Sequence, residues 1–370
     1  MSQAYNLVFS DGTGQRGVPD VNGKPGAGAT NIYKMYLAAN QVQAQTCFYD
    51  PGLGSDPQLT LDWITWGKNL VAKATGAGIT RNIRETYEFL IMNDAPDRRI
   101  GLFGFSRGAY TVRSLGGLLG LCGIPAAMQG GTNIRGTAKA EVARRNALID
   151  KAIGIYQDYG EEKKHIRKAN GAAFRAAYQC REVVPHVIGV FDTVQALGLP
   201  GITDVVNFFK HAFHDAELNP KVPFGFQALS IDEDRAIFSP QVWDQRKVAP
   251  TQSVEQVWFP GAHSDIGGGY DDRRLSDVTL DWMVAKCAQA GVGLRFPLDI
   301  TPAPSILGQH HTERTGWGML WRKAHRGVKI GKFAVDLDPL ATRIEDRFDA
   351  GPLGYRPEAL LGHPRVKSYY

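Results

Sequence analysis

A serine between two glycines is the strongest chemical signal in this chain of 370 residues. Residues 104–108 read Gly-Phe-Ser-Arg-Gly, directly after an apolar segment and directly before a helical pattern. Between a strand and a helix this pattern predicts a nucleophile elbow, a sharp turn that lifts the serine hydroxyl clear of the sheet. Ser106 is therefore the predicted nucleophile, and the Arg107 amide at the helix start is a predicted oxyanion donor. An ordinary strand-to-helix turn is the alternative interpretation.

His263 is the predicted general base, because a serine hydroxyl is a poor nucleophile until a base takes its proton. Of the nine histidines, it alone occupies the loop immediately after a late apolar strand, Ser253–Phe259. The glycines at 267–269 make that stretch turn-prone, so the ring is expected on a loop that reaches over Ser106. A histidine hydrogen-bonded within a glycine turn is the alternative.

Asp192 is the predicted third member, which would hold the imidazole in place. It ends the apolar segment 186–191, so its carboxylate is expected at the same carboxyl edge of the sheet as Ser106. Two rivals remain open at this point, Asp232 and Asp265. Either carboxylate could equally cap a turn or lie at the surface, and Asp265 could also support the neighbouring histidine.

The loop after the first predicted strand is expected beside the nucleophile. The segment Tyr5–Ser10 is apolar and breaks at Asp11-Gly12-Thr13. The amide of Gly12 or Thr13 is expected to complete the oxyanion hole, while Asp11 braces the loop.

The elements that would position these residues alternate between strands and helices. This order predicts the α/β class, with a mainly parallel, doubly wound sheet of the α/β-hydrolase type and helical cap insertions. We expect a single catalytic domain over residues 1–370 with a helical insertion at about 125–182. The predicted strands are 5–10, 46–50, 99–105, 186–191 and 253–259, and the predicted helices are 30–40, 82–92, 110–121 and 275–290.

A second insertion, at about 300–335, is basic and contains tryptophans. Residues 309–332 hold six Lys/Arg and one Glu together with Trp317 and Trp321. Such a segment could meet anionic lipid, and with the helical insertion it would form a lid and a lipid-facing rim. The alternative is a basic loop whose tryptophans pack on the domain.

The composition and the first residues of the chain indicate which partners the protein has and where it is made. The chain is 43% hydrophobic and 21% charged, and no apolar run approaches the roughly 18 residues that a membrane span needs. A net charge of +5 argues against a dedicated nucleic-acid partner. The segment Met1–Gly12 does not resemble a secretory signal, so we expect synthesis in the cytoplasm, with export only by a signal-independent route.

No metal or cofactor is predicted. The four cysteines, at 47, 122, 180 and 287, lack CxxC spacing and are expected to be buried thiols. His310 and His311 are adjacent and point apart, and the glycines at 267–269 do not continue into a phosphate-binding loop.

Several ordered blocks resemble a known family. They are Asp11-Gly12-Thr13 with Thr30-Asn31, residues 104–110 with Arg113, residues 191–194, residues 231–233 with Arg235, and residues 258–270. Together they resemble the α/β-hydrolase family that contains the Tle-type phospholipase effectors of bacterial type VI secretion systems. The resemblance runs from residue 5 to about 290, and residues 355–357 show a weaker similarity.

The resemblance implies a Ser-Asp-His triad at Ser106, Asp192 and His263 that acts on lipid esters. Two departures bear on the substrate. Gln227-Ala228 stands where relatives often have His-Ala, and the large membrane-anchoring domain of the lipase effectors is not expected here.

We therefore expect a serine esterase of the lipase or phospholipase A type, acting on a lipid or a small ester. The expected contacts are a membrane surface and an immunity or secretion protein. A hydrolase of soluble esters, thioesters or peptides is the first alternative. A binding module without catalysis on the same fold is the second.

Overall fold

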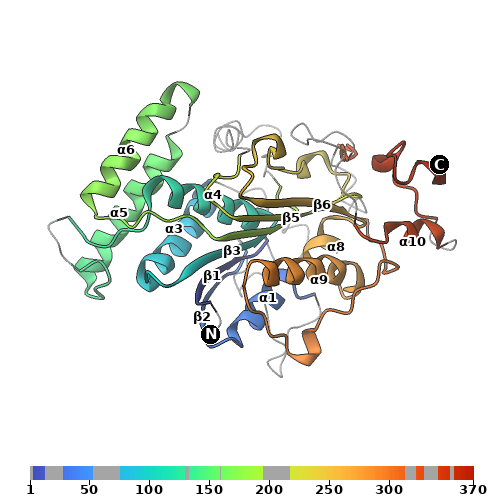
Figure 1. Ribbon diagram of the computed structural model, residues 1–370, viewed down its shortest axis with the longest axis horizontal. Helices are drawn as coiled ribbons and strands as arrows, with labels where there is room; N and C mark the ends of the chain where they lie inside the picture. The colour runs from blue at the N-terminus through green and yellow to red at the C-terminus, as the bar shows by residue number, and fades with distance from the viewer. Residues whose placement is uncertain are drawn as a thin grey trace.

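Six parallel strands form one sheet in the order β2-β1-β3-β4-β5-β6 (Figure 1). The structure, a computed structural model, describes residues 3–12, 28–52, 76–129, 133–158, 160–194, 217–312, 322–328, 341–350 and 354–370. The strands are β1 (Tyr5–Ser10), β2 (Gln45–Asp50), β3 (Arg99–Phe105), β4 (Val187–Phe191), β5 (Phe224–Ser230) and β6 (Ser253–Phe259).

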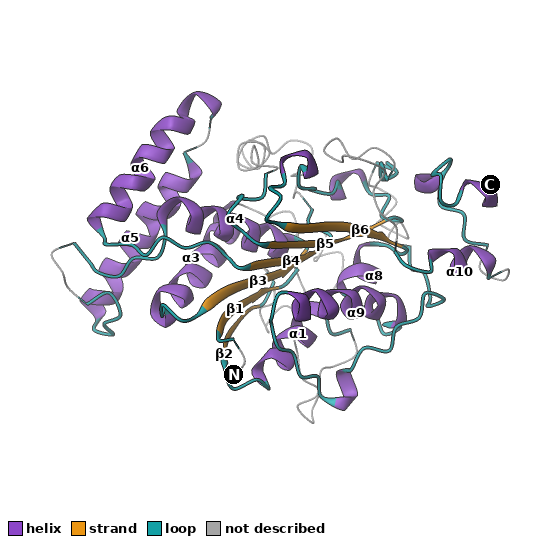
Figure 2. Cartoon of the chain, viewed as in Figure 1, coloured by secondary structure: helices purple, strands orange, loops and turns teal. Residues whose placement is uncertain are grey.

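Helices cover both faces of the sheet, as Figure 2 shows. One face carries α1 (Asn31–Asn40), α8 (His263–Gly267) and α9 (Arg274–Gln289), and the other carries α3 (Gly76–Asn93) and α4 (Arg107–Cys122). The remaining helices are α5 (Lys139–Gln157), α6 (Lys164–Ala177) and α10 (Ile344–Asp349). Short 3₁₀ turns are η1 (Glu161–Lys163), η2 (Ala236–Phe238), η3 (Gln245–Lys247), η4 (Leu298–Ile300), η7 (Glu358–Leu360) and η8 (Lys367–Tyr369).

The strands are apolar on both faces because each face is covered. In β1, Val8 packs into the core under α3 and α4, while Leu7 and Phe9 pack into the core under α1 and α9. All six residues of β1 are buried, as expected for a parallel strand inside a doubly wound sheet. The predicted α/β class with a mainly parallel, doubly wound sheet is confirmed.

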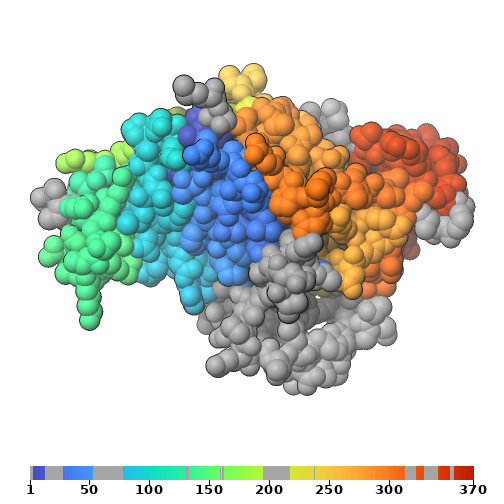
Figure 3. All heavy atoms as spheres, turned by 90° about the horizontal axis from the view of Figure 1, so that it is seen from below, coloured from blue at the N-terminus to red at the C-terminus, as the bar shows by residue number. Residues whose placement is uncertain are grey.

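A third core joins the C-terminal segment to the sheet. Leu229 and Trp258, from β5 and β6, pack against Val328, Phe348 and Leu360. In Figure 3 the C-terminal residues occupy one end of the molecule and the helices α5 and α6 the other. The last part of the chain is therefore built onto the β6 edge of the sheet.

Strand β5 was not predicted. Its sequence, Phe-Gly-Phe-Gln-Ala-Leu-Ser, interrupts the apolar pattern with a glycine and a glutamine. Gln227 is fully buried, and its side chain pairs with Arg113 of α4 and with the carbonyl of Gln241. Because this buried amide interrupts the apolar run and its partners lie elsewhere in the sequence, the hydrophobic pattern alone does not predict a central strand here.

The helical insertion does not lie where a lid over Ser106 would lie. Tyr156 of α5 packs closely against Gly117, and Gly171 of α6 packs against Leu121. Both contacts are on the C-terminal half of α4, whereas Ser106 precedes its first residue. The lid role expected for this insertion is therefore wrong for α5 and α6.

The cysteines differ from one another in burial. All four cysteines are free, but Cys47 and Cys180 are only partly buried, so the expectation of four buried thiols is wrong for these two. Within the described ranges, no helix is long and apolar enough to cross a membrane.

Candidate active site

The backbone at Ser106 adopts a conformation that few non-glycine residues tolerate. Its φ is 56° and its ψ is −118°, directly between β3 and α4. A Cβ on Gly104 would come within 2.6 Å of the backbone of Ala109, and one on Gly108 would overlap the carbonyl oxygen of Ser10. The flanking glycines are thus required by the close approach of α4 to β1 and β3, and the strained turn is the geometry of a nucleophile elbow.

His263 lies within hydrogen-bonding distance of both Ser106 and Asp192. Ser106 Oγ is 2.8 Å from His263 Nε2, and His263 Nδ1 is 2.6 Å from Asp192 Oδ2. The three residues are 7%, 5% and 0% exposed, although 71 and 157 sequence positions separate the pairs. This arrangement can pass a proton from the hydroxyl to the imidazole while the carboxylate fixes the ring.

His263 is the first residue of the helix α8, not part of a loop as expected. The Ala262 amide donates to Asp265 Oδ2 at 3.0 Å, which caps the start of this helix. The imidazole is also held between aromatic rings, with Phe105 at 4.7 Å and Phe238 at 5.0 Å between centroids. The ring therefore has a fixed orientation toward Ser106.

Arg326 is a residue of the site that sequence reasoning did not identify. Its Nη1 and Nη2 donate to Asp192 Oδ1 at 3.2 Å and Oδ2 at 3.1 Å, and Asp192 Oδ1 also accepts the Ser230 amide at 3.1 Å. Burial by itself would raise the pKa of Asp192, but Arg326 and the hydrogen bonds from His263 and Ser230 hold it below its ordinary value. The carboxylate stays ionised because a buried cation faces it.

Backbone pairing brings Arg326 to this position. Residues 234–236 and 322–324 pair through the Ala236 amide with the Arg322 carbonyl at 2.9 Å and the Ala324 amide with the Asp234 carbonyl at 2.8 Å. The basic composition of 309–332 predicted a surface, and no local signal distinguishes the one arginine that turns inward. Trp317 and Trp321 lie outside the described residues.

The rival acids have other partners. Asp232 Oδ2 accepts from the Gly261 amide at 2.6 Å and from the Tyr355 hydroxyl at 2.9 Å. Asp265 Oδ1 lies 2.7 Å from His311 Nδ1. Burial raises the pKa of both carboxyls, although hydrogen bonds and the neighbouring histidines oppose the rise. Both rivals brace the backbone just before His263, Asp232 at the Gly261 amide and Asp265 at the Ala262 amide.

The first loop lies beside the nucleophile, but the Gly12 amide already has an acceptor. A Cβ on Gly12 would come within 3.3 Å of the Ser106 Cβ, so the predicted proximity is present. Its N–H donates to Asp11 Oδ1 at 2.8 Å, so an oxyanion would have to compete with that carboxylate for the amide, and the oxyanion role of Gly12 stays a prediction. Thr13 lies outside the described residues.

Asp11 is a buried brace of this loop. Its Oδ2 accepts from Thr30 Oγ1 at 2.6 Å and from the Tyr49 hydroxyl at 2.8 Å. Burial raises the pKa of Asp11 to about 6, and that of the adjacent Asp50 to about 7, and no cation of the described residues pairs with either carboxyl to oppose the rise.

Arg107 presents two different groups to this region. Its amide is at the first position of α4, where the amides lack intrahelical acceptors and the helix dipole is positive, so it can donate to an oxyanion at Ser106. Its guanidinium is buried, and neither Nη1 nor Nη2 has a hydrogen-bond partner. Burial lowers the pKa of Arg107 to about 9.

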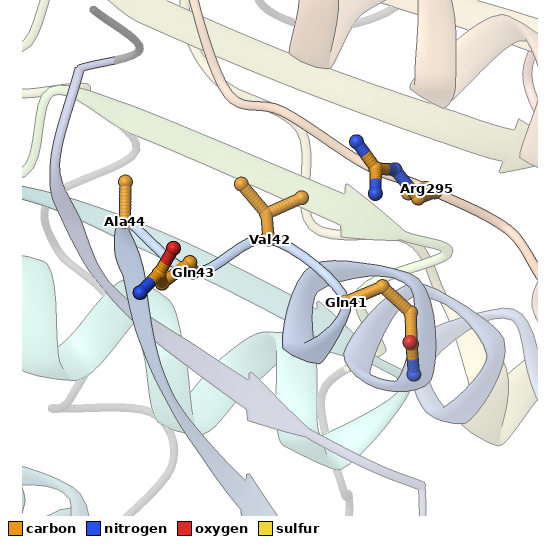
Figure 4. A pocket seen from close by; sticks show the side chains of 5 residues that line it. All are labelled: Gln41, Val42, Gln43, Ala44 and Arg295. Carbon is orange, nitrogen blue, oxygen red and sulfur yellow. The ribbon is translucent and has the colours of Figure 1, made fainter.

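The described side chains include no group of three or more His, Cys, Asp or Glu that could hold a metal ion. A surface depression lined by Gln41–Ala44 and Arg295 (Figure 4) precedes the start of β2, at the amino edge of the sheet, whereas Ser106 follows the carboxyl end of β3.

The chain is similar in sequence to one known family and to a curated protein. The model for the catalytic domain of the Tle1-like phospholipase effectors of type VI secretion systems matches residues 6–286. The uncharacterised protein YEL023C of Saccharomyces cerevisiae is 26% identical, over 80% of this chain and 58% of its own length.

Three solved structures are similar at low sequence identity. An uncharacterised Pseudomonas aeruginosa protein has a TM-score of 0.46 at 18% identity, covering 82% of this chain and 49% of its own. The Tle1 effector bound to the VgrG spike has a TM-score of 0.34 at 20% identity, covering 73% and 52%. Thermogutta terrifontis esterase 2 has a TM-score of 0.37 at 12% identity, covering 79% and 85%. The chain thus spans about half the length of several of these relatives.

Proposed function

The chain belongs to the family of Tle1-like phospholipase effector catalytic domains, and from this premise we propose that it hydrolyses acyl esters of glycerophospholipids through Ser106. The observation that carries the proposal is the hydrogen-bonded sequence from Ser106 Oγ to His263 and on to Asp192. A strained serine at a strand-to-helix turn, a histidine base and a buried acid are the components of a serine hydrolase.

Acylation begins at the serine. Ser106 Oγ attacks the carbonyl carbon of the acyl ester while His263 Nε2 takes the hydroxyl proton. The Asp192 carboxylate accepts a hydrogen bond from Nδ1–H and stabilises the imidazolium without taking the proton. The Arg107 amide donates to the oxyanion of the tetrahedral intermediate, since it projects from the start of α4 beside the reacting carbon.

The intermediate then collapses with loss of the lysolipid alkoxide, which takes the proton from His263 and leaves as the alcohol. Water attacks the acyl-enzyme next. His263 removes a proton from that water and returns one to Ser106 Oγ, so a fatty acid leaves and the free serine is restored.

Arg326 acts in this scheme as a positioning residue. Its two contacts with Asp192 leave the carboxylate few alternative orientations, and Oδ2 remains 2.6 Å from His263 Nδ1. The cation also keeps Asp192 ionised in a site from which water is excluded.

The wider biological setting belongs to the same proposal. Family membership supports delivery by a type VI secretion system, a route that needs no cleaved signal. The Tle1 effector is bound to the VgrG spike in its solved structure, and we extend a spike partner of this kind to the present chain.

The direct test compares wild type with Ser106→Ala. We expect wild type to release fatty acid and lysolipid from dihexanoylphosphatidylcholine and to react with a fluorophosphonate probe at Ser106. The variant should lose about 10⁴-fold or more in kcat on phospholipid and on p-nitrophenyl butyrate.

Circular dichroism checks that the variant is folded. Unchanged turnover in folded Ser106→Ala would refute the mechanism. If wild type hydrolysed p-nitrophenyl butyrate but no phospholipid, in monomers or micelles, the enzyme would act on a soluble ester instead.

A further inference from the structure

Arg107 carries a buried charge without a partner. The residue is 7% exposed, and both terminal nitrogens of its guanidinium are enclosed and unpaired. The other buried arginines of the described residues each donate at least one hydrogen bond. They are Arg113, Arg145, Arg235, Arg326 and Arg347.

Arg113 gives a matched comparison on the same helix. It is 8% exposed, its Nη1 donates to Gln227 Oε1 at 3.2 Å and to the Gln241 carbonyl at 2.6 Å, and its guanidinium lies 4.7 Å from the ring centre of Trp243. Burial lowers the pKa of Arg113 and of Arg107 alike, to about 9. The two residues differ in whether the protein itself supplies acceptors.

The position of Arg107 makes the charge still less favourable. It is the first residue of α4, where the positive end of the helix dipole disfavours a cation and favours an anion. A guanidinium that is both buried and unpaired at this place destabilises the free protein. An anion bound there would pair with the buried guanidinium and would also interact favourably with the helix dipole.

Arg107 directly follows Ser106, at the end of α4 where the reacting serine lies. In an α-helix each Cα–Cβ bond tilts toward the N-terminus, so Arg107 leans past the start of α4, the end at which Ser106 lies. Ser106 is itself only 7% exposed, so a substrate that reaches it enters a largely enclosed region beside the start of α4.

We propose that the Arg107 guanidinium binds the phosphodiester of the glycerophospholipid whose acyl ester lies at Ser106. The inference rests on the proposed function and names the group that makes a phospholipid the preferred ester. Only a few bonds separate the acyl carbonyl from the phosphorus in such a lipid, and arginine presents a planar, bidentate donor that suits phosphate.

The test measures a ratio of two substrates. Dihexanoylphosphatidylcholine and dihexanoylglycerol, both below their micellar concentrations, differ in the phosphodiester headgroup. In Arg107→Met the kcat/KM ratio of phospholipid to neutral lipid should fall about 100-fold, the loss expected for a hydrogen-bonded charge pair in a closed site. Arg107→Lys keeps the charge and should lose less of the ratio.

Arg113→Gln is the matched control and should leave the ratio unchanged, since that side chain is already paired within the protein. As a binding readout, sn-glycero-3-phosphocholine should inhibit the hydrolysis of p-nitrophenyl butyrate by wild type. The inhibition constant should rise at least tenfold in Arg107→Met. Fluorophosphonate labelling of Ser106 checks that the site of each variant is assembled.

Two results would overturn the inference. Equal losses of kcat/KM on both lipids would assign the guanidinium to the oxyanion or to structure, and no loss on either lipid would exclude a role in headgroup binding. Both results require that wild type hydrolyses phospholipid. Failure of wild type to do so would instead defeat the proposed function, so the two failures are distinguishable.

Discussion

Two buried arginines stand in opposite electrostatic situations. Arg326 donates two hydrogen bonds to Asp192, whereas within the described part of the chain neither terminal nitrogen of Arg107 has an acceptor. The charge of Arg326 is neutralised by Asp192, so this arginine can only hold its partner in place. The charge of Arg107 is not neutralised by the protein, and such a charge keeps affinity for an anion that arrives with a ligand.

Removing Arg326 should have the largest effect on stability. Arg326→Met leaves the Asp192 carboxylate buried without its cation, and we expect the free energy of unfolding to fall by about 3–5 kcal/mol. Urea denaturation followed by circular dichroism measures the change. Arg326→Lys should recover part of it, and a loss below about 1 kcal/mol in Arg326→Met would mean that the pair is not structural.

Asp11 extends the comparison to a buried carboxyl whose hydrogen-bond donors, in the described part of the chain, are all neutral. Its pKa is raised by burial to about 6. Its stabilising contribution is therefore complete below the unfolded pKa of about 4 and is lost as the pH rises through about 6. Asp192, with its lowered pKa, has the opposite dependence, in which stability is lost as the pH falls.

Asp11→Asn should accordingly gain stability relative to wild type between pH 4 and pH 7, by up to about 3 kcal/mol. Unfolding free energies of both proteins at several pH values give this difference. Asp50→Asn is the neighbouring control, expected to show the same sign with its midpoint nearer pH 7. A difference that does not vary with pH would show that Asp11 is ionised throughout.

Arg107→Met should have the smallest effect and the opposite sign to Arg326→Met. The methionine fills much of the same space without a buried charge, so we expect the free energy of unfolding to rise by about 1–3 kcal/mol. The same urea series provides the measurement. If Arg107→Met were destabilised as strongly as Arg326→Met, the contrast between the two arginines would be lost.

The sequence predicted those parts of the molecule whose signals are local. The strand and helix around residues 104–108 are contiguous, and the glycines follow from the steric demands of one turn. Asp192 and His263 were proposed from their positions after apolar strands, and the structure brings both to Ser106. Family membership, first suggested by ordered blocks of residues, is confirmed by the match to residues 6–286.

The remaining features depend on partners that are distant along the chain. Arg326 reaches Asp192 across 134 positions and comes from a segment whose composition resembles a basic surface. Strand β5 includes Gln227, whose burial is tolerated only because α4 supplies Arg113. The glycines around His263 predict a loop, but the structure has the start of α8 there, with Asp265 at the capping position.

The attachment of the C-terminal segment to the β6 edge has a consequence for biosynthesis. Ser106, Asp192 and His263 all leave the ribosome before residues 322–328, which carry Arg326 and add Val328 to the third core. A nascent or prematurely ended chain therefore holds the reacting side chains without the cation that orients them. The ion pair that orients Asp192 can therefore form only after residue 326 has been synthesised.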